Sequence, residues 1–116
     1  MEKPHKKLEV WKKSMEVASL IYKMSAEFPP DERFGLVSQM RRAAVSIPSN
    51  IAEGAARISR KEFRQFLSIA RSSLSELDTQ LDICYRLGLV NKEARHNIDG
   101  LLVQIDKMLY GLYQVR

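Results

Sequence analysis

Apolar residues recur every three or four positions along nearly the whole chain, which is the spacing of helices with one buried face. The clearest segment follows Ser59-Arg60-Lys61-Glu62, a pattern typical of a capping box at a helix N-terminus. Gly88 then predicts a left-handed residue that ends this helix. Between them the apolar positions repeat in steps of four and three, at Phe63, Leu67, Ala70, Leu74, Leu77, Leu81 and Cys84.

Two further segments, one near each end of the chain, have the same periodicity. The first is expected to end at Phe28-Pro29-Pro30, because proline disfavours helix at the residue before it. The last is expected to begin after Asn91, whose side chain can cap a helix. The first apolar stripe comprises Leu8, Trp11, Met15, Ala18, Tyr22 and Ser25, and the last comprises Ile98, Leu101, Ile105, Met108 and Leu112.

A fourth segment, from about Glu32 to Arg57, contains a proline within its helical pattern. Pro48 removes the hydrogen bond to the carbonyl of Ala44 and crowds it, at a cost of about 3 kcal/mol in an ordinary helix. We therefore predict a kink or break near residues 44–48. The apolar stripe of this helix is Leu36, Met40, Ala44, Ile47 and Ile51.

These patterns together predict an all-α fold. No stretch alternates with period two for long enough to form a strand, and the expected connections are short, which makes successive helices antiparallel neighbours. We predict a single-domain up-down-up-down four-helix bundle over residues 1–116, with a flexible tail at residues 1–6. No apolar run is long enough to span a membrane, and the N-terminus lacks the apolar stretch of a signal peptide, so we expect a cytoplasmic protein.

Charge is distributed unevenly along the chain. The net charge is +5, but residues 33–71 carry +6 and all other residues together carry −1. A local excess of this kind favours an anionic partner, nucleic acid first. A surface whose charges are balanced by neighbouring subunits is the alternative.

The second helix also has an ordered polar stripe beside its apolar one. One interpretation is a recognition or assembly face, and the other is a half-buried polar seam inside the bundle that fixes helix register. The stripe comprises Gln39, Arg42, Ser46, Asn50, Glu53 and Arg57.

The third helix has a charged stripe of two halves. Arg60, Arg64 and Arg71 lie within about 40° of one another on the helix, and Asp78 and Asp82 continue the same stripe. The basic half can bind phosphate, the whole stripe can pair antiparallel with a copy or a neighbour, or its charges are simply solvated. The candidate nucleic-acid contacts are Arg41, Arg42, Arg57, Arg60, Lys61, Arg64 and Arg71.

The sequence lacks the parts of a known catalytic site. His5 and His96 are the only histidines, and His96 completes a single helical Glu-x-x-His with Glu93, whereas a di-iron bundle needs two. No glycine-rich phosphate loop is present, and Cys84 is expected to be a small core residue. We therefore expect no enzyme activity, no metal and no cofactor.

Several ordered motifs resemble those of the 23S rRNA intervening sequence proteins, a bacterial family of four-helix bundles. The resemblance covers about residues 8–88. Its most specific part is Ser46-Ile47-Pro48-Ser49-Asn50-Ile51-Ala52-Glu53-Gly54. Other landmarks are Leu8-Glu9-Val10-Trp11, Gln39-x-Arg41-Arg42-Ala43 and Glu76-Leu77-x-Thr79-Gln80-Leu81.

The resemblance implies a ring-like homo-oligomer, with a pentamer as the expected form, and identifies no catalytic residue. A related branch of the family serves as an accessory protein of a reverse transcriptase, which implies nucleic-acid and protein binding. Two hypotheses follow: an oligomeric helical module that binds RNA or DNA through phosphate contacts, and an assembly or adaptor protein whose charged stripes bind a protein partner.

Overall fold

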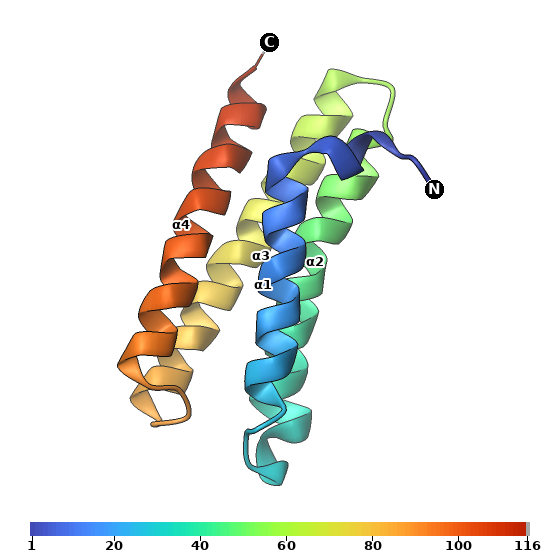
Figure 1. Cartoon of the computed structure of the whole chain (residues 1–116). Coiled ribbons are helices and arrows are strands. Elements are labelled where there is room, and N and C mark those ends of the chain that lie inside the picture. Colours follow the sequence, from blue (N-terminus) through green and yellow to red (C-terminus); the bar gives the residue numbers. More distant parts are fainter. Residues whose placement is uncertain (116) are drawn as a thin grey trace.

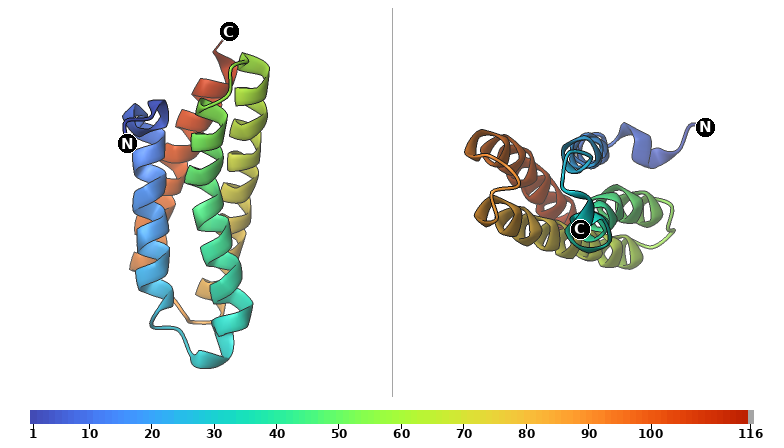
Figure 2. Two further views of the ribbon diagram at one scale, coloured as in Figure 1. Left: turned by 90° about the vertical axis from the view of Figure 1, so that its right-hand side faces the viewer. Right: turned by 90° about the horizontal axis from the view of Figure 1, so that it is seen from below.

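The computed structural model describes residues 1–115, and within them the chain forms four α-helices and no strand (Figure 1). The helices are α1 (Glu9–Ser25), α2 (Ser38–Ala55), α3 (Arg60–Arg86) and α4 (Lys92–Gln114). They pack as α1 on α2, α2 on α3, α3 on α4 and α4 on α1, in an elongated bundle of 43 × 24 × 21 Å (Figure 2). The predicted four-helix fold is confirmed. None of the described helices combines the length and apolar character needed to cross a membrane.

The predicted helix ends agree with the structure because they depend on local chemistry. The Ser59 hydroxyl accepts from the Glu62 amide at 3.1 Å, and the Asn91 side chain accepts from the Ala94 amide at 2.8 Å. Gly88 has a φ of +77°, and the Leu89 amide bonds the Cys84 carbonyl, as in a Schellman end. One detail differs from the expected capping box: the Glu62 carboxylate accepts from the Ser59 hydroxyl rather than from its amide.

Helix α2 continues without interruption through Pro48, so the expected break at residues 44–48 is not found. A milder bend at Pro48 stays a prediction. The irregular backbone lies earlier, in the π-helical turn Arg33–Val37, where Gly35 has φ −103° and ψ −107°. This turn follows the short 3-10 helix Pro30–Glu32 and joins α2 directly. The helical segment thus begins near the predicted position, but Gly35 separates its first turn from the rest.

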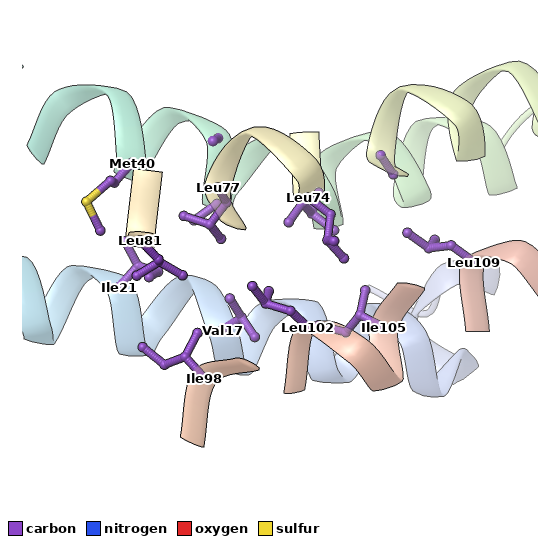
Figure 3. Close-up of a cluster of buried hydrophobic side chains, with 14 of the residues drawn as sticks. Val17, Ile21, Met40, Leu74, Leu77, Leu81, Ile98, Leu102, Ile105 and Leu109 are labelled. Carbon is purple, nitrogen blue, oxygen red and sulfur yellow. The ribbon is translucent and has the colours of Figure 1, made fainter. Parts of the chain in front are cut away.

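The core contains the predicted stripe of α3 and most of the α2 stripe, with Ile and Leu residues of all four helices (Figure 3). The predicted stripe of α1 is only partly confirmed. Ser25 is buried, and Leu8, Trp11 and Ala18 pack against the core. Met15 and Tyr22, however, are exposed, and Val17 and Ile21 are buried instead. Two neighbouring stripes of α1 have helical spacing, and the bundle buries the one that faces its axis. The buried residues of α1 are Val10, Ser14, Val17, Ile21 and Ser25.

The N-terminal segment has structure from Pro4 onward. Residues Pro4–Lys7 form a 3-10 helix that lies near the end of α2 (Figure 1). Pro4 and Leu8 line the same surface hollow as Arg57 and Ser59, in the connection between α2 and α3. The flexibility predicted for residues 1–6 stays a prediction. The 3-10 helix that begins at Pro4, however, contacts α1 and α2.

Candidate nucleic-acid interface

One end of the bundle has a clear excess of positive over negative side chains. The N-terminal segment and the α2–α3 connection meet there, around the hollow lined by Pro4, Arg57 and Arg60. Residues 1–8 and 53–64 together hold seven cationic and three acidic side chains, a net charge of +4 out of +5 for the chain. We call these residues the cationic end; its positive side chains are Lys3, Lys6, Lys7, Arg57, Arg60, Lys61 and Arg64.

The three lysines of the N-terminal segment are not among the nucleic-acid contacts that the sequence predicts. They are distant from Arg57 along the chain, and the segment was expected to be a flexible tail. Their positive charge was visible, but their position at the α2–α3 end depends on how α1 packs against α2. Lys6 donates to the carbonyl of Met1, a contact that leaves its charge uncompensated.

Arg57 and Lys61 are the most available of the predicted contacts at this end. Both are exposed, and among residues 1–115 neither forms an ion pair. The Arg57 guanidinium lies over the ring of Phe66, 4.8 Å from its centroid, which orients the cation without neutralising it. An anion that approaches the cationic end therefore meets these two side chains uncompensated.

Arg60 and Arg64 have a structural role that the sequence did not predict. Nε of Arg60 donates to the Val115 carbonyl at 2.9 Å, and its Nη2 donates to the Leu112 carbonyl. Nε of Arg64 donates to the Tyr113 carbonyl at 3.0 Å. Carbonyls at a helix C-terminus carry partial negative charge and lack intrahelical partners, so these arginines stabilise the end of α4.

Arg71 and Arg41 are also bound within the chain. Arg71 donates to the Asp106 carboxylate of α4 at 3.0 Å and lies over the ring of Tyr110. Arg41 donates to the Ser25 hydroxyl at 2.9 Å and to the Tyr22 carbonyl at 3.1 Å. The structure therefore does not bring the seven predicted residues into one patch, since Arg71 lies on the side of the bundle against α4.

Arg42 is exposed at the far end of α2, about fifteen residues and four turns from Arg57. It lines a surface groove together with Tyr22, Phe34 and Arg41. The two arginines that are adjacent in the sequence thus belong to a different region from the cationic end.

The polar stripe of α2 divides between the two interpretations. The Ser46 hydroxyl is 2.8 Å from that of Ser73 on α3, and the Asn50 amide donates to Ser46, so both side chains form a half-buried seam between the helices. Gln39 and Glu53 are exposed and lie outside this seam. Ser46 and Asn50 therefore have a structural role within the bundle. The role of Gln39 and Glu53 as subunit contacts stays a prediction.

The acidic half of the α3 stripe is paired with α4. Nε of Arg95 donates to Asp82 at 3.1 Å, its Nη2 donates to Asp78 at 2.5 Å, and Asp99 lies 3.7 Å from its Nη1. Burial alone would lower the pKa of Arg95, but the hydrogen bonds to Asp78 and Asp82 outweigh it and raise that pKa. The neighbour with which the charged stripe pairs is thus α4 of the same chain.

Residues 1–115 contain no group of three or more His, Cys, Asp or Glu side chains placed to hold a metal ion. Cys84 is fully buried and lies 3.3 Å from the Met40 sulfur. Burial raises the pKa of its thiol to about 11, and the charge of Glu32 adds to the rise. Its thiolate is therefore scarce near neutral pH, consistent with the core role predicted for it.

These observations define a small all-helical protein with a cationic end. Residues 6–111 match the model of the 23S rRNA-intervening sequence protein family, and the chain belongs to that family. It is also similar to the crystal structure of a protein of unknown function from the S23 ribosomal protein family of Bacteroides thetaiotaomicron VPI-5482. The two are 28% identical with a TM-score of 0.82, and the match covers 91% of this chain and 99% of the other. Among curated proteins no significant match is found.

Proposed function

We propose that this protein is a non-enzymatic, cytoplasmic homo-oligomer that binds RNA or DNA through phosphate contacts at its cationic end. The observation that carries the proposal is the +4 charge concentrated in residues 1–8 and 53–64, two segments that meet at one end of the bundle. Within this end, Arg57 and Lys61 have no carboxylate partner in the described part of the chain.

Contacts of this kind predict binding with little base selectivity. Arginine and lysine bound to phosphates displace condensed counterions, so affinity falls steeply with salt. Phe63 and Phe66 are half-buried, and the guanidinium groups of Arg60 and Arg57 lie over their rings. Because arginines already occupy these ring faces, the recognition we propose is of the backbone and not of the bases. Arg60 and Arg64 increase the positive electrostatic potential at this end, although their guanidinium groups are hydrogen-bonded to carbonyls at the end of α4.

The test is a salt titration of binding to mixed-sequence RNA and duplex DNA by the double variant Arg57→Gln/Lys61→Gln. We expect the slope of log K against log salt to fall by about 1.8 for duplex DNA, because each lost phosphate contact removes about 0.9. The matched control is Arg86→Gln/Lys92→Gln, which removes the same charge at the opposite end, from two exposed residues. Equal slopes in the two double variants would contradict the proposal.

The non-enzymatic part of the proposal is tested on the same pure protein. Metal content and hydrolysis of the RNA and DNA probes are measured during the titration. We expect neither bound metal in stoichiometric amount nor cleavage of the probes.

The alternative function is an adaptor that binds a protein partner, such as the accessory subunit of a reverse transcriptase. The observation that favours it is an exposed apolar surface on α1, α2 and the π-helical turn before α2, which includes Met15, Tyr22, Phe34 and Val45. Negligible affinity for nucleic acid at low salt, together with normal folding, would favour this alternative.

The assembly itself is measured by light scattering on the purified chain. A pentamer, the form that the family resemblance implies, would have five times the mass of the 13.4 kDa chain. Mass and nucleic-acid affinity are separate readouts, so the two parts of the proposal can fail independently.

A further inference from the structure

Helix α1 carries an apolar stripe that the single chain leaves half exposed. Trp11, Met15, Ala18 and Tyr22 follow one another in steps of four, three and four, the spacing of a buried helical face. Yet Met15 and Tyr22 are 44% and 46% exposed. Soluble chains scatter single apolar residues over their surface, but a stripe with the periodicity of a core indicates a contact surface.

The neighbouring outward face of α2 continues this surface with mostly small side chains and one arginine. Ser38, Arg42, Val45, Ser49 and Ala52 repeat in steps of four and three, and Val45 is 41% exposed. A surface groove of about 480 Å³ lies where this face begins, lined by Tyr22 at the end of α1, by the π-helical turn Arg33–Val37 and by the first two turns of α2. We call it the α1–α2 groove; its lining residues include Tyr22, Phe34, Val37, Arg41, Arg42 and Val45.

Helix α3 presents the complementary shape. Six of its residues follow the same four-three spacing on the side opposite the core, and all six are exposed. Ile69 and Ile83, which are 47% and 42% exposed, lie two heptads or about 21 Å apart along the helix, with Glu76 between them. We call this the α3 ridge; it comprises Gln65, Ile69, Ser72, Glu76, Thr79 and Ile83.

We infer that the α3 ridge of one copy of this chain docks in the α1–α2 groove of a second copy. The inference rests on the proposed homo-oligomer and assigns the faces that build it. Helices α1 and α3 each pack mainly on α2 and α4, so groove and ridge belong to different sides of the molecule. A contact between two different faces is heterologous, and it leaves one free groove and one free ridge at the ends of any open chain of copies.

Charge favours this pairing. The groove has Arg33, Arg41 and Arg42 along it, and no carboxylate within residues 1–115 forms an ion pair with any of them. The ridge carries Glu76, whose carboxylate accepts a hydrogen bond from the side-chain amide of Gln80 at 3.2 Å. An acidic ridge in a basic groove selects that orientation, because charge complementarity acts on specificity more than on affinity.

The test uses one groove variant and one ridge variant, with mass measured by light scattering. Val45→Glu places a carboxylate in the groove opposite Glu76, and Ile69→Lys/Ile83→Lys places cations on the ridge opposite the arginines. All three positions are exposed, so helical content and thermal unfolding should change little. We expect each variant alone to be a monomer. An equimolar mixture should associate again, since one intact groove and one intact ridge remain in each pair.

A charge exchange adds a rescue. Arg42→Glu should reduce assembly, and Arg42→Glu/Glu76→Arg should restore it. If wild-type protein is oligomeric and both surface variants keep its mass, or if their mixture stays monomeric, the pairing is wrong while the proposed assembly stands. If wild-type protein is a monomer, the proposed assembly fails as well. A groove variant that loses nucleic-acid affinity but keeps its mass would reassign the groove to a ligand and overturn the inference.

Discussion

At the scale of single residues, Gly54 sets how closely α2 and α3 approach. A Cβ built on this glycine would lie 2.7 Å from Cβ of Phe66 and 2.9 Å from the ring of Phe63. Real side chains do not tolerate such distances, and the Phe66 Cβ is fixed to its own backbone. The backbone of residue 54 has no positive φ, so its conformation does not require glycine. The close approach of α3 is what requires a residue without a side chain there.

We therefore expect Gly54→Ala to lower the free energy of unfolding by about 1–3 kcal/mol, the usual cost of overpacking a core. Gly111→Ala is the control, because Gly111 lies within α4 and its added Cβ would meet nothing within 4 Å. There the better helix propensity of alanine should raise stability by up to about 1 kcal/mol. Urea unfolding of both variants measures the contrast, and equal effects would contradict the packing argument.

At the scale of elements, α4 is fastened to α3 by charge at both ends. Arg60 and Arg64 hold its last carbonyls, and Arg95 near its start is held by Asp78 and Asp82. The arginines that the sequence offered as ligand contacts therefore serve first in joining two helices. The Arg95 side chain is only 13% exposed, and its ion pairs lie at the opposite end of the α3–α4 interface from the Arg60 and Arg64 hydrogen bonds.

Replacing Arg60 and Arg64 with glutamine should fray the end of α4. Loss of the hydrogen bonds and of the favourable charge at the helix C-terminus should cost about 1–2 kcal/mol in total. Amide hydrogen exchange in the last turn of α4 should accelerate, while exchange at its first turn stays unchanged. Arg57→Gln/Lys61→Gln removes the same charge at the start of α3 without touching α4, so it should leave exchange in α4 unaltered.

The sequence predicts the features that depend on neighbouring residues and fails for those that depend on residues far apart in the chain. The caps at Ser59 and Asn91 and the left-handed Gly88 depend on neighbouring residues, and all three are confirmed. The buried stripe of α1 was mistaken because two adjacent stripes satisfy the helical period, and tertiary packing selects between them. The partners of Arg60 and Arg64 lie about fifty residues away and are backbone carbonyls, which carry no sequence signal.

At the scale of the whole molecule, positive charge is concentrated at one end of an elongated bundle. Only part of it comes from the basic central third that the sequence emphasised, because the fold brings Lys3, Lys6 and Lys7 to the same place. Arg71 and Arg42 lie elsewhere, so the charge that a distant anion meets differs from the charge counted along the chain. The field at that end should increase the rate at which anionic polymers associate.

Replacing Lys3, Lys6 and Lys7 with glutamine should lower the association rate constant for a fluorescent single-stranded RNA at low salt, with a smaller effect on dissociation. The reason is that peripheral charges act mainly on encounter. Stopped-flow mixing at several salt concentrations measures both rates, with Lys23→Gln/Arg86→Gln/Lys92→Gln at the opposite end of the bundle as a control of equal charge. An equal loss in the control would mean that net charge alone matters, wherever it lies.

The tight turn between α2 and α3 has a thermodynamic consequence for binding. Gly54 packs closely against α3, and Ser59 caps the N-terminus of α3. These two contacts restrict the conformation of the segment that carries Arg57 and Lys61. A disordered basic tail loses conformational entropy when it binds a polyanion, whereas these two cations are held at a nearly fixed separation before binding. Calorimetry should thus record a smaller entropic penalty than for a disordered lysine-rich peptide of equal charge, since preorganisation removes part of that loss in advance.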